Sequence, residues 1–221
     1  MKGTKLALTA CIVSALFAAS AANAQFHLPS LGTASTTNSS SDALAAQDQL
    51  VKSFIASQSE VLNAQSLLAQ AYGLKDQAAA CDAQQKALQS TGTDTNALQK
   101  TVDVSNSANE AIAEQQAKQT TLTAEEKEYY AQSLPHFAKG VLGTRDVVMQ
   151  AEKFTATAKG SMTGMSGLTT GLTKLKAGAF VAKSTPSYSK NLFDVFRKTM
   201  TISQNNGVKV PSDATQALAG L

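Results

Sequence analysis

A repeat of apolar and small residues with helical spacing begins at Asp42 and continues to about Gln89, and it restricts this part of the chain to one class of structure. Side chains of this kind recur every three to four residues, as one face of an α-helix requires. They are Leu44, Val51, Phe54, Ile55, Val61, Leu62, Leu68, Ala69, Tyr72 and Gly73. The expected opposite, polar face carries Gln47, Asp48, Lys52, Gln58, Glu60, Asn63, Gln65 and Gln70. The spacing predicts one long helix, in which Gly73 is a kink or a point of close approach.

Three further segments have the same helical period. The segment STGTD at 90–94 predicts a stop, with Gly92 as the helix breaker, and a thin polar stripe predicts a second helix over 94–119. Thr123 and Glu126 form a capping box that opens a third helix, which we expect to kink or restart at Pro135. After a predicted loop at 183–190, a last helix is expected over 187–204.

No strand pattern competes with this helical reading. Alternation of apolar and polar residues is scarce, and alanine and glutamine outnumber the β-branched and aromatic residues that strands favour. The sequence therefore predicts an all-α fold: an elongated antiparallel helical bundle of about four helices with a disordered N-terminal tether. The expected organisation is a signal peptide over 1–24, a tether over 25–41, a helical bundle domain over 42–204 and a C-terminal tail over 205–221.

The first 24 residues have the pattern of an export signal. Lys2 and Lys5 precede an apolar run that extends from Leu6 to about Ala22, and Ala22-Asn23-Ala24 offers the small residues that a signal peptidase accepts. A second interpretation takes Cys11 as a lipidated first residue, but only about five apolar residues would then precede the cut, against a usual 7–15. Because no later uncharged run reaches the roughly 20 residues of a membrane span, we expect a periplasmic or secreted protein that is soluble after cleavage near Ala24.

Cleavage would leave Cys81 as the single cysteine of the mature chain. One thiol cannot form an internal disulfide, so stability must come from packing. We interpret Cys81 as a small helix-packing residue. The stretch 25–41, rich in Ser, Thr and Asn, has too little apolar surface to offset the entropy of ordering, which predicts the tether.

Catalytic, metal and cofactor chemistry finds little support in the residues. The sequence has no metal-ligand spacing, nucleophile elbow or phosphate-binding loop, so we expect no enzyme activity, no cofactor and no metal site. His136 is interpreted as structural or surface-exposed. The acids Glu125, Glu126 and Glu128 are explained by their place at a helix N-terminus, and one ring of Tyr129-Tyr130 is expected in the core.

Charge is divided along the chain. Residues 42–128 hold twelve acidic residues and six lysines, net −6, and residues 137–200 hold ten basic and three acidic residues, net +7. The two blocks either face each other in the bundle, or the basic block 137–200 makes a peripheral contact with an anionic membrane surface. The near-neutral balance of the mature chain argues against nucleic-acid binding.

The segment 160–173 contains no charged residue and four glycines, Gly160, Gly164, Gly167 and Gly171. Its length, about 21 Å as a helix, is too short to span a membrane. The glycine steps of 4, 3 and 4 place all four on one helical stripe, whose propensity cost of about 4 kcal/mol calls for close packing against another helix. We predict that this glycine seam contacts another helix, a second copy of the chain or another envelope protein.

Together these features predict an exported, non-enzymatic helical-bundle protein with a binding or scaffolding role in the bacterial envelope. The alternative is a membrane-active or lipid-binding helical protein that uses the Gly-rich segment 155–183.

Overall fold

The computed structural model describes residues 38–162 and 174–221, which form six α-helices and no strand within these ranges. The helices are α1 (Asn38–Ala71), α2 (Lys75–Leu88), α3 (Thr95–Lys118), α4 (Ala124–Met162), α6 (Lys176–Asn205) and α7 (Ser212–Ala219). The predicted all-α, antiparallel packing is confirmed for this part of the chain. Residues 1–37 and 163–173, which include the predicted signal peptide and most of the predicted tether, lie outside it.

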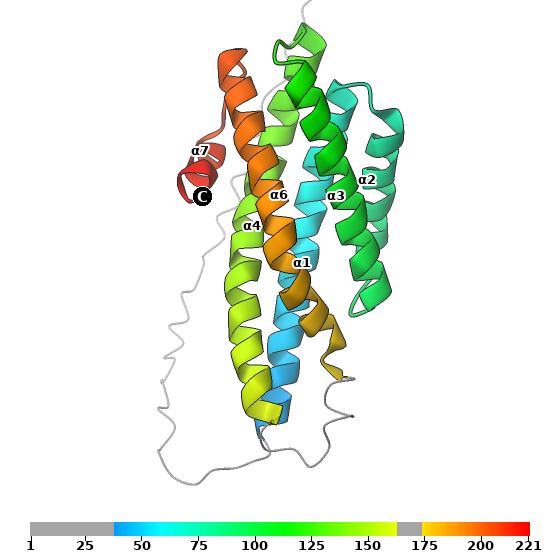
Figure 1. Ribbon diagram of the computed structural model, residues 1–221, viewed down its shortest axis with the longest axis vertical. Helices are drawn as coiled ribbons and strands as arrows, with labels where there is room; N and C mark the ends of the chain where they lie inside the picture. The colour runs from blue at the N-terminus through cyan, green and yellow to red at the C-terminus, as the bar shows by residue number, and fades with distance from the viewer. Residues whose placement is uncertain (1–37, 163–173) are drawn as a thin grey trace, which may run out of the picture. The chain divides into compact units, whose positions relative to one another are not determined.

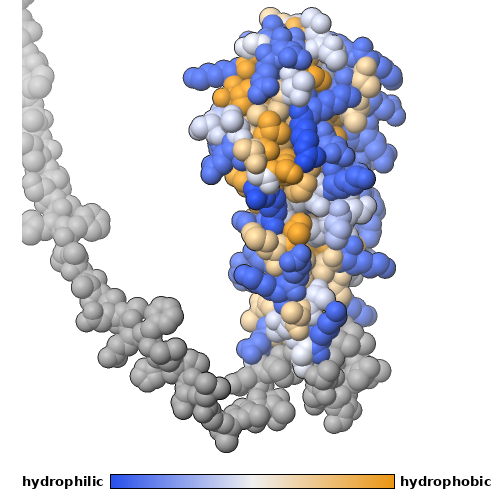
Figure 2. Space-filling model, turned by 60° about the vertical axis from the view of Figure 1, so that its left-hand side comes forward, coloured by the Kyte–Doolittle hydropathy of each residue, from blue (hydrophilic) through white to orange (hydrophobic). Residues whose placement is uncertain are grey.

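The long helices α1, α4 and α6 lie side by side, with the α2–α3 hairpin on one side and α7 on the other, next to α4 (Figure 1). Helix α1 contacts α2, α3, α4 and α6, so it is enclosed along much of its length. The core lies between α1, α3, α4 and α6, where the rings of Phe137 and Phe196 meet edge to face with centroids 5.2 Å apart. Figure 2 shows the side of the bundle on which α7 lies, where apolar surface gathers mainly in the upper half.

The prediction of one helix over 42–89 is wrong, because the chain reverses at Gly73. Gly73 adopts a positive φ of 68°, which an L side chain rarely tolerates. Its N–H bonds to the carbonyl of Gln70 at 3.0 Å and the N–H of Leu74 to that of Ala69 at 2.8 Å, the pair of bonds of a Schellman helix end. Helix α1 therefore ends at Ala71, begins at Asn38 rather than Asp42, and is followed by the antiparallel α2.

Helix α6 is longer than the sequence predicts. It begins at Lys176 and continues through Pro186, so the predicted loop at 183–190 is helical instead. The proline side chain is exposed and needs no room in the core. Hydroxyl groups bond the carbonyls of the same turns, Thr185 to Val181 at 2.6 Å and Ser189 to Pro186 at 3.1 Å. Helix α4 likewise continues through Pro135 without restarting.

Other helix limits agree with the sequence. The carboxylate of Asp94 accepts from the N–H of Asn96 at 2.9 Å at the start of α3. The capping box is present: Thr123 Oγ1 accepts from the N–H of Glu126 at 3.3 Å, and Glu126 Oε2 accepts from the N–H of Thr123 at 2.6 Å. Within the predicted tail 205–221, residues 212–219 form α7, which packs on α4. Since Gly73 divides one expected helix and α7 adds another, the expected number of about four is too low.

Two glycines bring α1 and α4 into close contact. A Cβ atom on Gly140 would lie 2.6 Å from Cγ2 of Val61 and 3.1 Å from its backbone nitrogen. A Cβ on Gly143 would lie 3.1 Å from Cβ of Ser57, whose hydroxyl donates to the Gly140 carbonyl at 2.9 Å. No larger residue fits between the two helices at Gly140 without a shift of the backbone or of Val61.

Candidate binding site

An apolar groove lies between the C-terminal half of α4 and the N-terminal half of α6. Two adjoining hollows of about 440 and 470 Å³ make up the groove and share Thr155, Lys159 and Ala182. The remaining lining residues are Val148, Ala151, Glu152, Phe154, Ala156, Ala158, Leu175, Ala179, Lys183, Thr185 and Pro186. Volumes of this size match those of small-ligand sites, which are mostly apolar with a few polar groups.

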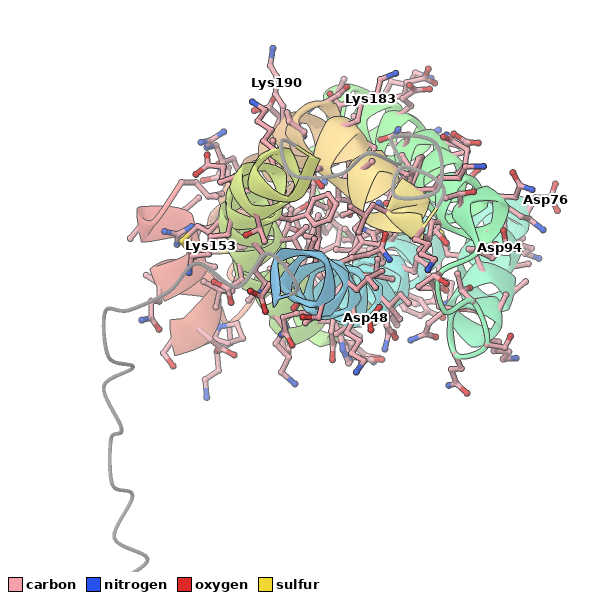
Figure 3. All side chains as sticks on the ribbon, turned by 90° about the horizontal axis from the view of Figure 1, so that it is seen from below. Asp48, Asp76, Asp94, Lys153, Lys183 and Lys190 are labelled. Carbon is pink, nitrogen blue, oxygen red and sulfur yellow. The ribbon has the colours of Figure 1, made fainter. Side chains whose placement is uncertain are left out.

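Two lysines, Lys159 and Lys183, line the groove. Four more are exposed in the same part of the sequence: Lys153 on α4, Lys174 just before α6, and Lys176 and Lys190 on α6. Figure 3 shows Lys153, Lys183 and Lys190 on the α4 and α6 side of the bundle, whereas Asp48, Asp76 and Asp94 lie on the side of α1, α2 and α3. The groove therefore opens on the basic side of the molecule, with Glu152 as the only acidic residue in its lining.

The two charged blocks do not neutralise each other through ion pairs among the described residues. The ion pairs found there are His136 with Glu60, at 2.6 Å, and Arg197 with Asp194, at 3.1 Å, and neither joins the acidic block to the basic one. The basic residues 174 and 176 also stand at the N-terminus of α6, where the helix dipole disfavours cations. These lysines are therefore not placed where they would stabilise the helix.

Gln47 on α1 fixes the start of α6 beside the groove. Its Nε2 donates to the carbonyl of Lys174 at 2.9 Å, and its Oε1 accepts from the N–H of Gly178 at 3.0 Å. Because α6 has no local side-chain cap, this amide satisfies a backbone N–H that the helix start leaves open. Gly178 admits the ring of Phe154, which lines the groove: a Cβ at Gly178 would lie 2.7 Å from that ring.

Gln47 was expected on the solvent-exposed, polar face of the first helix, and this expectation is wrong. Gln47, Gln58 and Gln65 are all buried, with at most 4 % of each residue exposed. The reason is that four other helices surround α1, so its second face also contacts protein. The recurrence of glutamine at steps of 11 and 7 residues was the available signal, but a single sequence does not distinguish buried from solvated glutamine.

Only one residue of the predicted glycine seam lies in the described part of the chain. Gly160 is exposed near the end of α4, and a Cβ there would have no atom within 4 Å. Gly164, Gly167 and Gly171 lie outside the described residues. The seam therefore stays a prediction. Glycines of other positions make close helix contacts in the described residues: Gly140 and Gly143 of α4 lie against α1, and Gly178 of α6 lies against Phe154 of α4.

The other residues considered for catalysis, His136, Glu126 and Tyr130, form hydrogen bonds with neighbouring side chains of the bundle. His136 Nδ1 lies 2.6 Å from Glu60 Oε2, and Asn63 is its other polar neighbour. Hydrogen bonds from Thr123 and Gln119 lower the pKa of Glu126 against the opposing effect of desolvation. Tyr130 is buried, as expected for one ring of the tyrosine pair, and its hydroxyl bonds that of Tyr72.

Cys81 is a buried free cysteine on α2, in agreement with a packing role. Burial, with a smaller contribution from Asp82, raises the pKa of its thiol to about 12. Across residues 38–162 and 174–221, no three His, Cys, Asp or Glu side chains are grouped so that they could hold a metal ion.

No family model, no curated protein and no solved structure matches the chain. None of the helices in the described ranges is long and apolar enough to cross a membrane.

Proposed function

We propose that this chain is an exported, non-enzymatic helical-bundle protein that acts by binding, and that its ligand is the anionic surface of a lipid membrane. The observation that carries the proposal is the apolar groove between α4 and α6, together with Lys159 and Lys183, which line it. Acyl chains favour apolar surface and anionic headgroups favour lysine, so this combination suits a peripheral membrane contact.

The position of the basic residues supports the proposal further. Each lysine near an anionic bilayer contributes on the order of 1 kcal/mol to binding. Lys174 and Lys176 oppose the dipole of α6, and the described residues provide no ion-pair partner for them. An anionic partner would turn this unfavourable arrangement into a favourable one.

A non-enzymatic role is supported by the surroundings of the polar groups. The pair His136–Glu60 is at the contact of α1 with α4, outside the lining of the groove. The residues that line the groove include one carboxylate, Glu152, and no histidine or cysteine, so they offer neither a carboxylate pair nor a carboxylate–histidine pair for general acid–base catalysis.

Flotation with lipid vesicles tests the proposal. Vesicles containing phosphatidylglycerol should carry the protein to the top of a density gradient at 20 mM salt, whereas vesicles of phosphatidylcholine alone should not. Because charge attraction is screened by ions, binding should weaken strongly at 500 mM salt. An absence of flotation with anionic vesicles at low salt would reject the proposed ligand.

An envelope protein or a second copy of the chain is the other candidate partner, through the glycine seam from Gly160 to Gly171. Gly160 adjoins Lys159 of the groove, so both partners would use the same end of α4. Analytical ultracentrifugation over a hundredfold range of protein concentration tests self-association. A mass that stays monomeric would exclude the second copy.

A further inference from the structure

The groove between α4 and α6 exists because small side chains face each other there. Farther along the same pair of helices, the rings of Phe137 and Phe196 meet and fill the contact. In the groove, by contrast, alanines make up a large part of the lining and leave the space open. They are Ala151, Ala156, Ala158, Ala179 and Ala182. The hollow is therefore a consequence of the sequence of both helices.

The groove is elongated along the two helices. Its lining extends from Val148 to Lys159 on α4, and from Leu175, just before α6, to Pro186 on α6. At about 1.5 Å per residue, each side is about 16 Å long. The hydrocarbon core of a bilayer is about 30 Å thick, so one leaflet contributes about 15 Å. The groove therefore has the length of one acyl chain as it lies in a leaflet.

The groove combines an apolar floor with two cations at its edge. Phe154 and Leu175 are buried residues of the floor, whereas Lys159 and Lys183 are exposed. Neither lysine has an ion-pair partner within residues 38–162 and 174–221. The one acidic residue of the lining, Glu152, belongs to the hollow that Lys183 does not line. The hollow that both lysines line is therefore suited to an anionic group.

We propose that the groove binds one anionic amphiphile with a single acyl chain, either a fatty acid or a lysophospholipid. The chain lies along the alanines, and the carboxylate or phosphate lies at Lys159 and Lys183, whose ammonium groups donate charge-assisted hydrogen bonds. Concave, mostly apolar sites with a few polar groups are typical of small ligands. This inference rests on the proposed function, because it gives the same groove a ligand of lipid type, but the ligand is one molecule instead of a membrane surface.

Calorimetric titration with amphiphiles below their critical micelle concentration tests the inference without any bilayer. Dodecanoate represents the fatty acids, and lauroyl-lysophosphatidylglycerol represents the lysophospholipids. Binding of either one supports the inference and identifies the source of the ligand, whereas binding of neither overturns it. Lauroyl-lysophosphatidylcholine has the same chain and no net charge, so it should bind about fivefold more weakly than the phosphatidylglycerol form. Equal binding of the two would overturn the role of the lysines.

The length of the chain gives a second measurement on the same protein. Octanoate, decanoate and dodecanoate carry the same carboxylate, so differences in their affinity report the burial of the chain. Affinity should rise by up to about fourfold for each added methylene that the groove buries. An affinity that does not change with chain length would show that the chain stays in water, and this result would overturn the inference.

A variant that fills the groove without changing its charge separates this inference from the proposed function. Ala182 lines both hollows, so Ala182→Leu should weaken dodecanoate binding by about tenfold. Its lysines remain, so it should still float with anionic vesicles. Ala83→Leu, at an exposed position of α2, is the matched control. Equal dodecanoate binding by the two variants would overturn the inference.

Two further controls keep the outcomes distinct. Ala182 is half-buried, so circular dichroism checks the fold of its variant, and Ala156→Leu, at an exposed position in one hollow, repeats the test. Wild type that floats with anionic vesicles but binds no single amphiphile would overturn this inference and leave the membrane contact. Wild type that binds dodecanoate but does not float would overturn the membrane contact and leave this inference.

Discussion

The side-chain oxygen of Gln47 accepts a hydrogen bond from the backbone N–H of Gly178 at 3.0 Å, across 131 residues of sequence. The same amide donates to the carbonyl of Lys174, so one side chain of α1 closes the first turn of α6. This contact is long-range in sequence, and it replaces the local N-cap that α6 lacks. The orientation of the groove therefore depends on a residue that does not line it.

Replacing Gln47 with leucine should weaken the attachment of α6. The variant leaves the N–H of Gly178 buried without its acceptor, which costs about 1–3 kcal/mol of unfolding free energy. Chemical denaturation measures this loss, and hydrogen exchange should show faster exchange at 176–179 than elsewhere in α6. Gln49→Leu is the matched control, because Gln49 is an exposed residue of the same helix. Equal stabilities for the two variants would show that the Gln47 bonds contribute nothing.

Gly140→Ala should destabilise the protein, whereas Gly160→Ala should stabilise it. The new methyl group at 140 meets Val61 at 2.6 Å, and overpacking of this kind costs about 1–3 kcal/mol. At 160 the space is open, and alanine gains up to about 1 kcal/mol of helix propensity over glycine. Denaturant titration of both variants checks the signs. A loss of stability at 160 would instead indicate that the predicted glycine seam packs closely there.

The helical fold was predictable from the local sequence, but the positions at which helices begin and end were predictable only in part. The capping box at Thr123 and the stop at Gly92 depend on a few neighbouring residues, and both are present. Two predictions were wrong in opposite directions. Gly73 was expected within a continuous helix but ends α1, and Pro186 was expected in a loop but lies within α6. Their outcome depends on tertiary surroundings: α2 can fold back along α1 after Gly73, and the exposed side of α6 accommodates the proline ring.

The candidate site was predictable only as a region. The basic block and the segment 155–183 indicated this part of the chain, but the groove extends beyond that segment, to Val148 on α4 and to Pro186 on α6. The contribution of Gln47 was not predictable, because it requires knowing that α1 passes the start of α6. The bonds of Gln65 to Ser105 and Asn109 were missed for the same reason, because they join α1 to α3.

The buried thiol of Cys81 should make stability depend on alkaline pH. Burial raises its pKa from 9.0 to about 12, so above pH 9 the unfolded state loses this proton while the folded state keeps it. The free energy of unfolding then falls as pH rises from 9 towards 12, and by about 1–2 kcal/mol at pH 10.5. Tyrosines titrate in the same range, so the measured quantity is the difference between wild type and Cys81→Ala at each pH. A difference that stays constant from pH 8 to pH 11 would contradict the pKa shift.

A carboxylate placed in the groove should prevent binding to anionic vesicles. Ala179 is exposed and lines the groove, so Ala179→Glu should fold normally while it repels anionic headgroups and makes the apolar surface polar. Ala79→Glu, at an exposed position of α2, adds the same charge on the opposite side as a control. Surface plasmon resonance on immobilised anionic vesicles compares the two variants. Equal binding by both would place the contact elsewhere.

The central claim is that the lysines of the α4–α6 groove bind an anionic membrane surface, and the most direct test is the vesicle affinity of two double variants that lose the same charge. Lys159→Gln with Lys183→Gln removes both lysines that line the groove, and Lys86→Gln with Lys100→Gln removes two exposed lysines of α2 and α3. At about 1 kcal/mol for each lysine near the surface, the groove variant should bind anionic vesicles about 30-fold more weakly than wild type, while the control stays within about twofold. Equal losses in the two variants would show that only net charge matters and would contradict the assignment of the groove.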